Sequence, residues 1–214
     1  MVQFSLWDIF IFLLGALRWT AALSLIAFVG GSLVGMGLLM LRFTKLRGAA
    51  TAVAWYVQIF QGTPLLMQLF LVYFGLALLG MDTSPLVSAA ICLTLYASAY
   101  LTEIWRGCVN AIPKGQWEAS TSLALNFTQQ MRYVILPQAL RVGVAPTVGF
   151  LVQIIKGTAL ASVIGFVELT KAGQMISNAT YQPFLAYTFV GLLYFALCYP
   201  LSWWSQRLET RRLA

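Results

Sequence analysis

Hydrophobic residues fill long stretches of the chain, and short polar stretches separate them. The hydrocarbon core of a bilayer needs about 20 predominantly apolar residues for each helix that crosses it. The pattern therefore predicts an all-α integral membrane protein with about five transmembrane helices. These are expected over Leu17–Leu41, Ala54–Leu79, Pro85–Trp105, Val142–Val167 and Phe184–Trp204.

The apolar stretches follow one another without a linker or a low-complexity segment, which indicates one membrane domain over residues 16–205. Residues 1–15 are expected to form a separate N-terminal interfacial segment, a short helix on the outer face. Residues 206–214 are rich in arginine and are expected to form a basic cytoplasmic tail.

The second apolar stretch is interrupted between Gln61 and Pro64. A proline inside a helix removes one backbone hydrogen bond, so Pro64 leaves the carbonyl of Phe60 without its helical partner. Freed carbonyls are tolerated in a membrane where they face protein or a water-filled cavity. Pro64 is therefore expected to be a hinge, either beside a polar pathway or in ordinary packing. Pro146 is expected to break the fourth stretch in the same way.

Composition supports a membrane protein and excludes an ordinary soluble domain. The chain is 60% hydrophobic and 9% charged, with a mean hydropathy of +0.83, whereas soluble domains carry about 25% charged residues. The basic residues behind the net charge of +7 lie at the ends of apolar stretches. This placement indicates membrane topology and not nucleic-acid binding. Lysine and arginine gather after the first, third and fifth stretches, so the N-terminus is expected outside and the C-terminus in the cytoplasm.

Residues that carry chemistry are scarce. The chain has no histidine, and its cysteines, Cys92, Cys108 and Cys198, are odd in number and far apart. This pattern supports neither a disulfide framework nor a metal site. The acids are not clustered, and no nucleophile is paired with a base, so a membrane enzyme is disfavoured and no catalytic residue is expected.

The longest polar segment, residues 113–137, lies between two hydrophobic blocks. Pro113 suits a helix start, and Glu118 lies early enough to favour the positive end of the helix dipole. Asn126 is expected to end this helix, and Pro137 suits the first turn of the next one. The segment is thus expected to fold as a helix, a turn and a helix, either to dock a partner or to lie on lipid. Its apolar anchors are Trp117, Leu123, Leu125 and Phe127.

The same segment resembles the cytoplasmic signature of ATP-binding-cassette importer permeases, which reads E-A-A, three residues, G, nine residues and I-x-L-P. Here Glu118-Ala119-Ser120, Ala124 and the VILP sequence at 134–137 fit that spacing without a gap. The departures are Ser120, Ala124 and Val134. Because alanine disfavours the positive φ that glycine permits, the turn at Ala124 is expected to shift, or Asn126 to take that role.

Three longer blocks resemble the polar amino-acid branch of that family and occur in its order. They are FQGTPLLMQLFLVYFGL at 60–76, SAYLTEIWRGCVNAIPKGQWEAS at 98–120 and IKGTALASVIGFVEL at 155–169. The last block departs from the family at Gly157 and Ala159, which makes a direct ligand role for this chain less certain. The chain is identified as a member of the polar amino-acid permease group, with a type I importer permease fold.

The resemblance implies a multi-pass protein of the bacterial inner (plasma) membrane that hydrolyses nothing and binds no cofactor itself. Its implied partners are a second permease subunit, identical or paralogous, and two ABC ATPase subunits that bind ATP and Mg²⁺. An extracytoplasmic solute-binding protein delivers a small polar amino acid. The absence of a G-x-x-x-x-G-K-[ST] sequence agrees with this division of labour. The residues implied to couple the permease to the ATPase are Pro113, Gly115, Glu118, Ala119, Ser120 and Ala124, and Arg132 is either a further contact or an ordinary positive-inside charge.

Charged groups at membrane depth cost about 2.5–3.5 kcal/mol on insertion scales and mark functional sites. Lys156 lies near the middle of the fourth stretch and, with Gln153 and Thr158, is expected to border the solute pathway. Its alternative role is to tie helices or subunits together. Glu103 either lines the pathway or pairs with Arg106, three residues later. The further pathway candidates, at the interruption of the second stretch, are Gln61 and Thr63.

The resemblance leaves the cargo open. The same architecture serves other small polar solutes, such as opines or organic cations, and an ATP-independent channel or secondary transporter is the distant alternative. Which amino acid is carried, whether the permease pair is a homodimer or a heterodimer, and whether this chain touches the solute are all open at this point.

Overall fold

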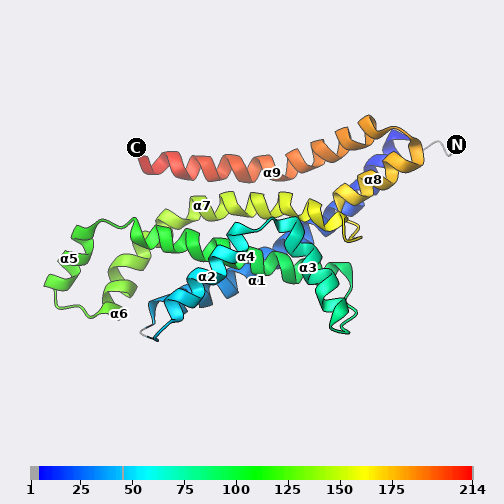
Figure 1. Cartoon of the computed structure of the whole chain (residues 1–214). Coiled ribbons are helices and arrows are strands. Elements are labelled where there is room, and N and C mark those ends of the chain that lie inside the picture. Colours follow the sequence, from blue (N-terminus) through cyan, green and yellow to red (C-terminus); the bar gives the residue numbers. More distant parts are fainter. Residues whose placement is uncertain (1–4, 45, 214) are drawn as a thin grey trace.

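The computed structural model describes residues 5–44 and 46–213, and these residues contain helices and no β-strand (Figure 1). The long helices are α1 (Leu6–Phe43), α4 (Pro85–Asn110), α7 (Leu136–Gly157) and α9 (Pro183–Leu213). The shorter ones are α2 (Ala49–Gly62), α3 (Leu65–Leu78), α5 (Lys114–Ser122), α6 (Phe127–Gln129) and α8 (Leu169–Thr180). A π-helical turn, Gln130–Ile135, joins α6 to α7, and a 3₁₀ turn, Thr158–Ser162, follows α7.

The prediction of about five membrane crossings is confirmed within the described residues. Four helical segments are long and apolar enough to span a membrane, and the bent pair α2–α3 makes a fifth. The bounds of the fourth crossing were predicted wrongly: the helical span runs over Phe127–Ser162 and not over Val142–Val167. The error arises because residues 163–167 are as apolar as a membrane helix but lie in a turn, where Gly165 has a φ of 91°.

The interior forms where α1 and α4 lie side by side, because small residues on both helices permit close approach. Gly31 packs on Ala97, and Gly35 lies against the backbone of Ser98. Around this seam, Leu23, Leu93 and Leu101 are fully buried with apolar side chains of α3 and α7. The seam therefore holds the first and third crossings together.

The N-terminal end of α1 is part of the packed structure. Residues 6–15 continue α1 without a break, and Ile9 and Leu13 are buried against α8 and α9. Ser5 caps this helix through a hydrogen bond from the backbone N–H of Asp8. The first crossing is thus longer than Leu17–Leu41, and the described structure shows no boundary near residue 15. An interfacial location for this end stays a prediction.

The two prolines behave differently. At Pro64 the chain turns by 105° between α2 and α3, so the predicted kink is present, and its role as a hinge stays a prediction. The prediction of a break at Pro146 was wrong, because α7 continues through it. A proline removes only one helical hydrogen bond. Beside this turn, the hydroxyl of Ser205 on α9 donates to the carbonyl of Ala145 at 2.8 Å.

Candidate functional site: the loop between α4 and α7 and polar positions between the helices

The segment that links α4 to α7 projects from one end of the molecule as α5, a turn and α6 (Figure 1). Figure 1 shows the α1–α2 connection and the C-terminus toward this same end, whereas the N-terminus and α8 lie at the other. This arrangement is the one that the distribution of basic residues requires. The orientation across the membrane itself stays a prediction.

The helix α5 is anchored on one face and free on the other. Pro113 is its N-cap, as the sequence predicted. Trp117 packs on a small core with Val109 and Ile135, and Ser120 is buried with its hydroxyl donating to the Trp117 carbonyl at 2.8 Å. The other face is exposed, with Gly115 and the side chains of Glu118 and Ala119. The predicted helix-turn-helix is confirmed, and of its signature residues Glu118 and Ala119 are accessible to another molecule, whereas Ser120 is buried.

Ala124 keeps the left-handed turn that glycine makes in the family signature. Its φ is 55°, and its N–H donates to the Thr121 carbonyl at 2.9 Å while that of Leu125 donates to Ser120 at 3.3 Å. This is the Schellman pattern for a helix end. The prediction that the turn shifts, or that Asn126 ends the helix, was wrong. Asn126 instead caps α6, where Gln129 completes a capping box.

Gln130 stabilises this turn and was missed from the sequence. Its side chain is mostly buried, and Nε2 donates to Thr121 Oγ1 and to the Leu125 carbonyl, both at 3.0 Å. A glutamine in a polar segment gives no signal of burial. Only the fold brings it back onto the turn, where it compensates for the missing glycine.

Replacing Ala124 with glycine should stabilise the loop. Left-handed φ costs an L-residue about 1–2 kcal/mol, so we expect Ala124→Gly to raise the free energy of unfolding by about 1 kcal/mol. Ala119→Gly, at an exposed helical position, should lower it by about 1 kcal/mol. Thermal unfolding of the purified complex measures both changes. If both variants shifted the melting temperature equally and in the same direction, the left-handed turn at Ala124 would be contradicted.

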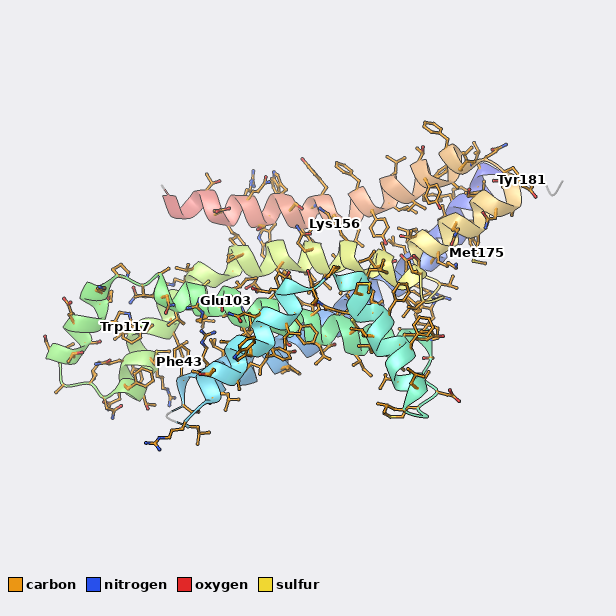
Figure 2. The ribbon with its side chains drawn as sticks, in the orientation of Figure 1. Phe43, Glu103, Trp117, Lys156, Met175 and Tyr181 are labelled. Atoms are coloured by element: carbon orange, nitrogen blue, oxygen red, sulfur yellow. The ribbon has the colours of Figure 1, made fainter. Side chains whose placement is uncertain are left out.

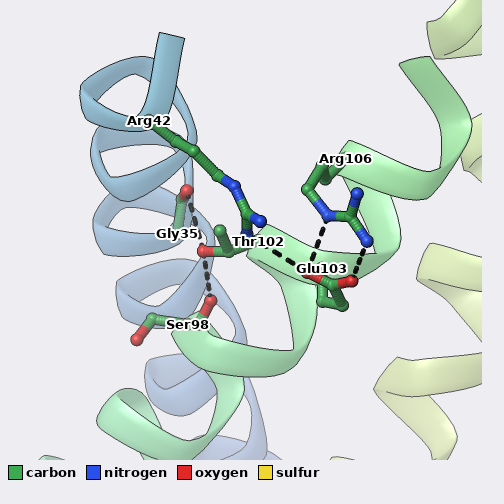
Figure 3. Close-up of polar contacts among 6 residues, drawn as sticks. All are labelled: Gly35, Arg42, Ser98, Thr102, Glu103 and Arg106. Atoms are coloured by element: carbon green, nitrogen blue, oxygen red, sulfur yellow. Dashed lines mark hydrogen bonds and ion pairs between the residues drawn. The ribbon is translucent and has the colours of Figure 1, made fainter. Parts of the chain in front are cut away.

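Glu103 lies between two arginines (Figure 3). Its carboxylate accepts hydrogen bonds from both Nε and Nη2 of Arg106, the former at 2.9 Å. Arg42, from the end of α1, approaches the same carboxylate at 3.5 Å. Nearby, Thr102 Oγ1 lies within hydrogen-bond distance of the carbonyls of Ser98 and Gly35. Of the two roles left open for Glu103, the structure shows the pairing with Arg106 and adds Arg42.

Neutralising Glu103 should lower the stability of the α1–α4 pair more than it lowers solute uptake. Its side chain is 33% exposed, so we expect a loss between that of surface and buried pairs, about 1–2 kcal/mol for Glu103→Gln. Arg42→Gln should cost less, because its contact is longer. Unfolding and uptake are measured on the same variants. Lost uptake with unchanged stability would favour the pathway role instead.

The pathway candidates on α7 do not form one cluster. Lys156 is the last residue but one of α7, not a mid-helix residue, and it lies between α7 and α9 (Figure 2). It borders a hollow of about 280 Å³ with Tyr194, Cys198 and Ser202 of α9. Gln153 is exposed one turn earlier. Thr158 is buried, and its hydroxyl donates to the Ile155 carbonyl at 2.7 Å, so it does not face the exposed surface with Lys156.

Comparison with known proteins decides the family. The model of the family described as "Binding-protein-dependent transport system inner membrane component" matches residues 31–213. The chain belongs to this family.

Individual relatives agree with the family match. This permease is 31% identical over 189 residues to the probable amino-acid ABC transporter permease protein YckA of Bacillus subtilis, covering 88% of this chain and 84% of that one. It is 32% identical over 212 residues to the L-cystine transport system permease protein TcyB of the same organism, covering 99% and 89%.

Solved structures share the fold of this permease. A crystal structure of an amino acid ABC transporter with histidines has a TM-score of 0.89 at 31% identity and covers 94% of each chain. An inward facing structure of the MetNI methionine ABC transporter has a TM-score of 0.77 at 22% identity. The type I importer permease fold is therefore confirmed, and the chain is a transport subunit of the inner membrane.

Sequence reasoning also missed the role of Glu168. Its side chain is fully buried and accepts hydrogen bonds at 2.8 Å from the N–H groups of Thr170 and Lys171 and from the Tyr194 hydroxyl. Burial raises the pKa of this carboxyl. The group caps α8 and ties it to α9 in this permease. An acidic residue directly before a helix start was the available signal.

Proposed function

We propose that this chain is the membrane-spanning permease subunit of an ATP-driven importer of small polar amino acids. The observation that carries the proposal is the geometry of α5. Trp117 and Ser120 anchor one face of this helix, while Glu118 and Ala119 are exposed on the other. An anchored, exposed helix between the third and fourth crossings is suited to transmit movement of a partner into the membrane. The relatives named for amino-acid and cystine transport support the cargo class.

In this proposal, two cytoplasmic ABC ATPase subunits bind ATP and Mg²⁺, and α5 docks on one of them. A second permease subunit, identical or paralogous, completes the pathway, and an extracytoplasmic binding protein delivers the solute. Closure of the ATPase pair shifts the permease between two states only as far as it binds them with different affinity. The rigid link through α5, the π-helical turn and α7 is what lets that difference reach the membrane helices.

Co-purification tests this assembly directly. The chain is expressed with its candidate ATPase, second permease and binding protein, and the tagged permease is isolated in a mild detergent. We expect the ATPase to co-purify and its ATP hydrolysis to rise when binding protein loaded with amino acid is added. An ATPase that never associates would contradict the proposal. Stimulation by an opine or an organic cation, but by no amino acid, would replace the cargo.

Lys156 is proposed to attract the carboxylate of the solute, and this is testable apart from assembly. Lys156→Met keeps the length of the side chain and removes its charge. We expect uptake to fall about tenfold or more, the effect of roughly 1.4 kcal/mol, while the ATPase still co-purifies. Lys171→Met, at a partly exposed position in the first turn of α8, is the matched control and should leave uptake unchanged. Normal uptake in Lys156→Met would exclude this role.

A further inference from the structure

The start of α8 is held by a buried carboxylate that no basic side chain neutralises. Glu168 is fully buried, and it forms no ion pair with any of the described residues. Burying an anion without a cation is costly, so hydrogen bonds have to balance its charge. A serine or a threonine would cap the helix without burying a charge. The carboxylate at this position therefore indicates a role beyond capping.

The second role of Glu168 is to connect α8 to α9. Its Oε1 accepts from the backbone N–H of Lys171, and its Oε2 accepts from the backbone N–H of Thr170, both at 2.8 Å. The same Oε2 accepts from the Tyr194 hydroxyl of α9 at 2.8 Å. Because Tyr194 gives its one hydroxyl proton to Glu168, the Thr170 hydroxyl donates to Tyr194 at 3.1 Å. One carboxylate thus serves both the cap and the neighbouring helix.

The helix α8 is also packed tightly against its neighbours. The backbone N–H of Leu169 donates to Thr20 Oγ1 of α1 at 3.1 Å. A Cβ on Gly173 would lie 2.4 Å from Val190 Cγ2 of α9, so α8 and α9 approach as closely as a glycine permits. The three helices share one apolar core. No slack is left in which α8 could shift without α9.

Movement of α9 in turn reaches α7 and the loop that carries α5. Cys198 of α9 packs with Val152 and Ile155 of α7. Further along, the Ser205 hydroxyl donates to the Ala145 carbonyl at 2.8 Å. The helix α7 follows directly on the π-helical turn and α6, which lead back to α5. A continuous set of packed elements therefore joins α8 to α5.

The outer face of α8 is open to another molecule. The helix lies toward the end of the molecule opposite α5 (Figure 1). Gln174, Met175 and Asn178 are exposed on it, and Phe184 is exposed at the start of α9. In the proposed transporter, the binding protein arrives at this end. A force applied there meets α8 first.

We propose that Glu168 is a positioning residue of the transport cycle, which through Tyr194 makes α8 and α9 move as one body; this rests on the proposed function. When the loaded binding protein docks, displacement of α8 carries α9 and α7 with it and stimulates the ATPase bound to α5. The joint stays closed throughout the cycle, because opening it would take a donor from a buried charge.

Tyr194→Phe tests the joint on the full transporter in proteoliposomes. The change removes the hydroxyl and keeps both backbone hydrogen bonds of Glu168, so α8 stays capped. ATP hydrolysis is measured with and without binding protein that has been equilibrated with an equimolar mixture of the proteinogenic L-amino acids. We expect the increase caused by the binding protein to fall about tenfold or more, the effect of losing one hydrogen bond to a charged group.

Tyr187→Phe is the matched control. It is the same substitution two turns earlier on α9, and the Tyr187 hydroxyl makes no hydrogen bond within the described part of the chain. This variant should keep the full increase in hydrolysis. The melting temperatures of both variants show whether the complex is intact.

A disulfide between α8 and α9 should replace the lost joint. A Cβ on Gly173 would lie 3.7 Å from Val190 Cβ, and the Cβ atoms of a disulfide lie about 3.5–4.5 Å apart. We therefore add Gly173→Cys and Val190→Cys to Tyr194→Phe. Oxidation should restore the increase in hydrolysis, and a reducing agent should abolish it again. Because phenylalanine remains at position 194, the restored increase cannot come from a contact of the hydroxyl with solute.

The possible results separate the joint from the proposed function. Full stimulation in Tyr194→Phe, or a disulfide that forms without restoring stimulation, would overturn the joint alone. So would a loss of stimulation when the cysteine pair is oxidised in a chain that retains Tyr194, because α8 and α9 would then have to separate during the cycle. Absence of stimulation in the unchanged transporter would contradict the proposed function together with the joint.

Discussion

We expect Gly31→Leu to disrupt the packing of α1 on α4 and to lower the free energy of unfolding. A Cβ at Gly31 would lie 2.5 Å from the Cβ of Ala97 and 3.1 Å from the backbone N of Ser98, and neither is the movable end of a flexible side chain. Overpacking of this kind costs about 1–3 kcal/mol and sometimes more, and leucine adds three carbons beyond the Cβ. We expect a loss of at least about 3 kcal/mol, measured by thermal unfolding of the purified complex.

Gly37→Leu is the matched control, on the same helix. Nothing lies within 4 Å of a Cβ at Gly37, so the same substitution should change the melting temperature little. Equal melting temperatures for the two variants would contradict the packing of α1 on α4.

Ala119→Arg is expected to disconnect the permease from its ATPase without unfolding it. Ala119 is exposed on α5, so a long charged side chain there projects into the proposed docking surface and not into the protein. Each 1.4 kcal/mol lost at that interface is a factor of ten in affinity, and we expect ATP-dependent uptake to fall at least about tenfold. The measurements are co-purification of the ATPase and uptake in proteoliposomes.

The matched control is Ala179→Arg, the same substitution at an exposed alanine of α8, which lies toward the opposite end of the molecule (Figure 1). It should leave co-purification of the ATPase intact. If both variants retain the ATPase equally well, α5 is not the docking element.

The sequence predicted the features that depend on local chemistry. Apolar length predicts the number of crossings, and the helix start at Pro113 follows from the preference of proline for the first turn. The bend at Pro64 follows from the missing N–H of proline. The spacing from Glu118 to the VILP sequence predicts the position of the loop between α4 and α7.

The features that the sequence did not predict depend on partners far along the chain. In the sequence, Gln68 and Gln130 look like ordinary polar residues. The fold places Gln68 at the bend between α2 and α3, and Gln130 at the left-handed turn of Ala124. Ala124 retains a positive φ because the surrounding hydrogen bonds outweigh its intrinsic cost. Pro146 lies within an unbroken α7, which packs along α9. Side chains from distant elements thus decided the details of the site.

The most direct test of the central claim is ATP-dependent uptake in proteoliposomes. The permease is reconstituted with its ATPase and binding protein, with and without a second permease, and a panel of labelled basic, acidic and amide amino acids is supplied. The account predicts accumulation of at least one amino acid that requires ATP and disappears with Ala119→Arg. Uptake in the absence of ATP, or no uptake of any amino acid with either permease composition, would contradict it.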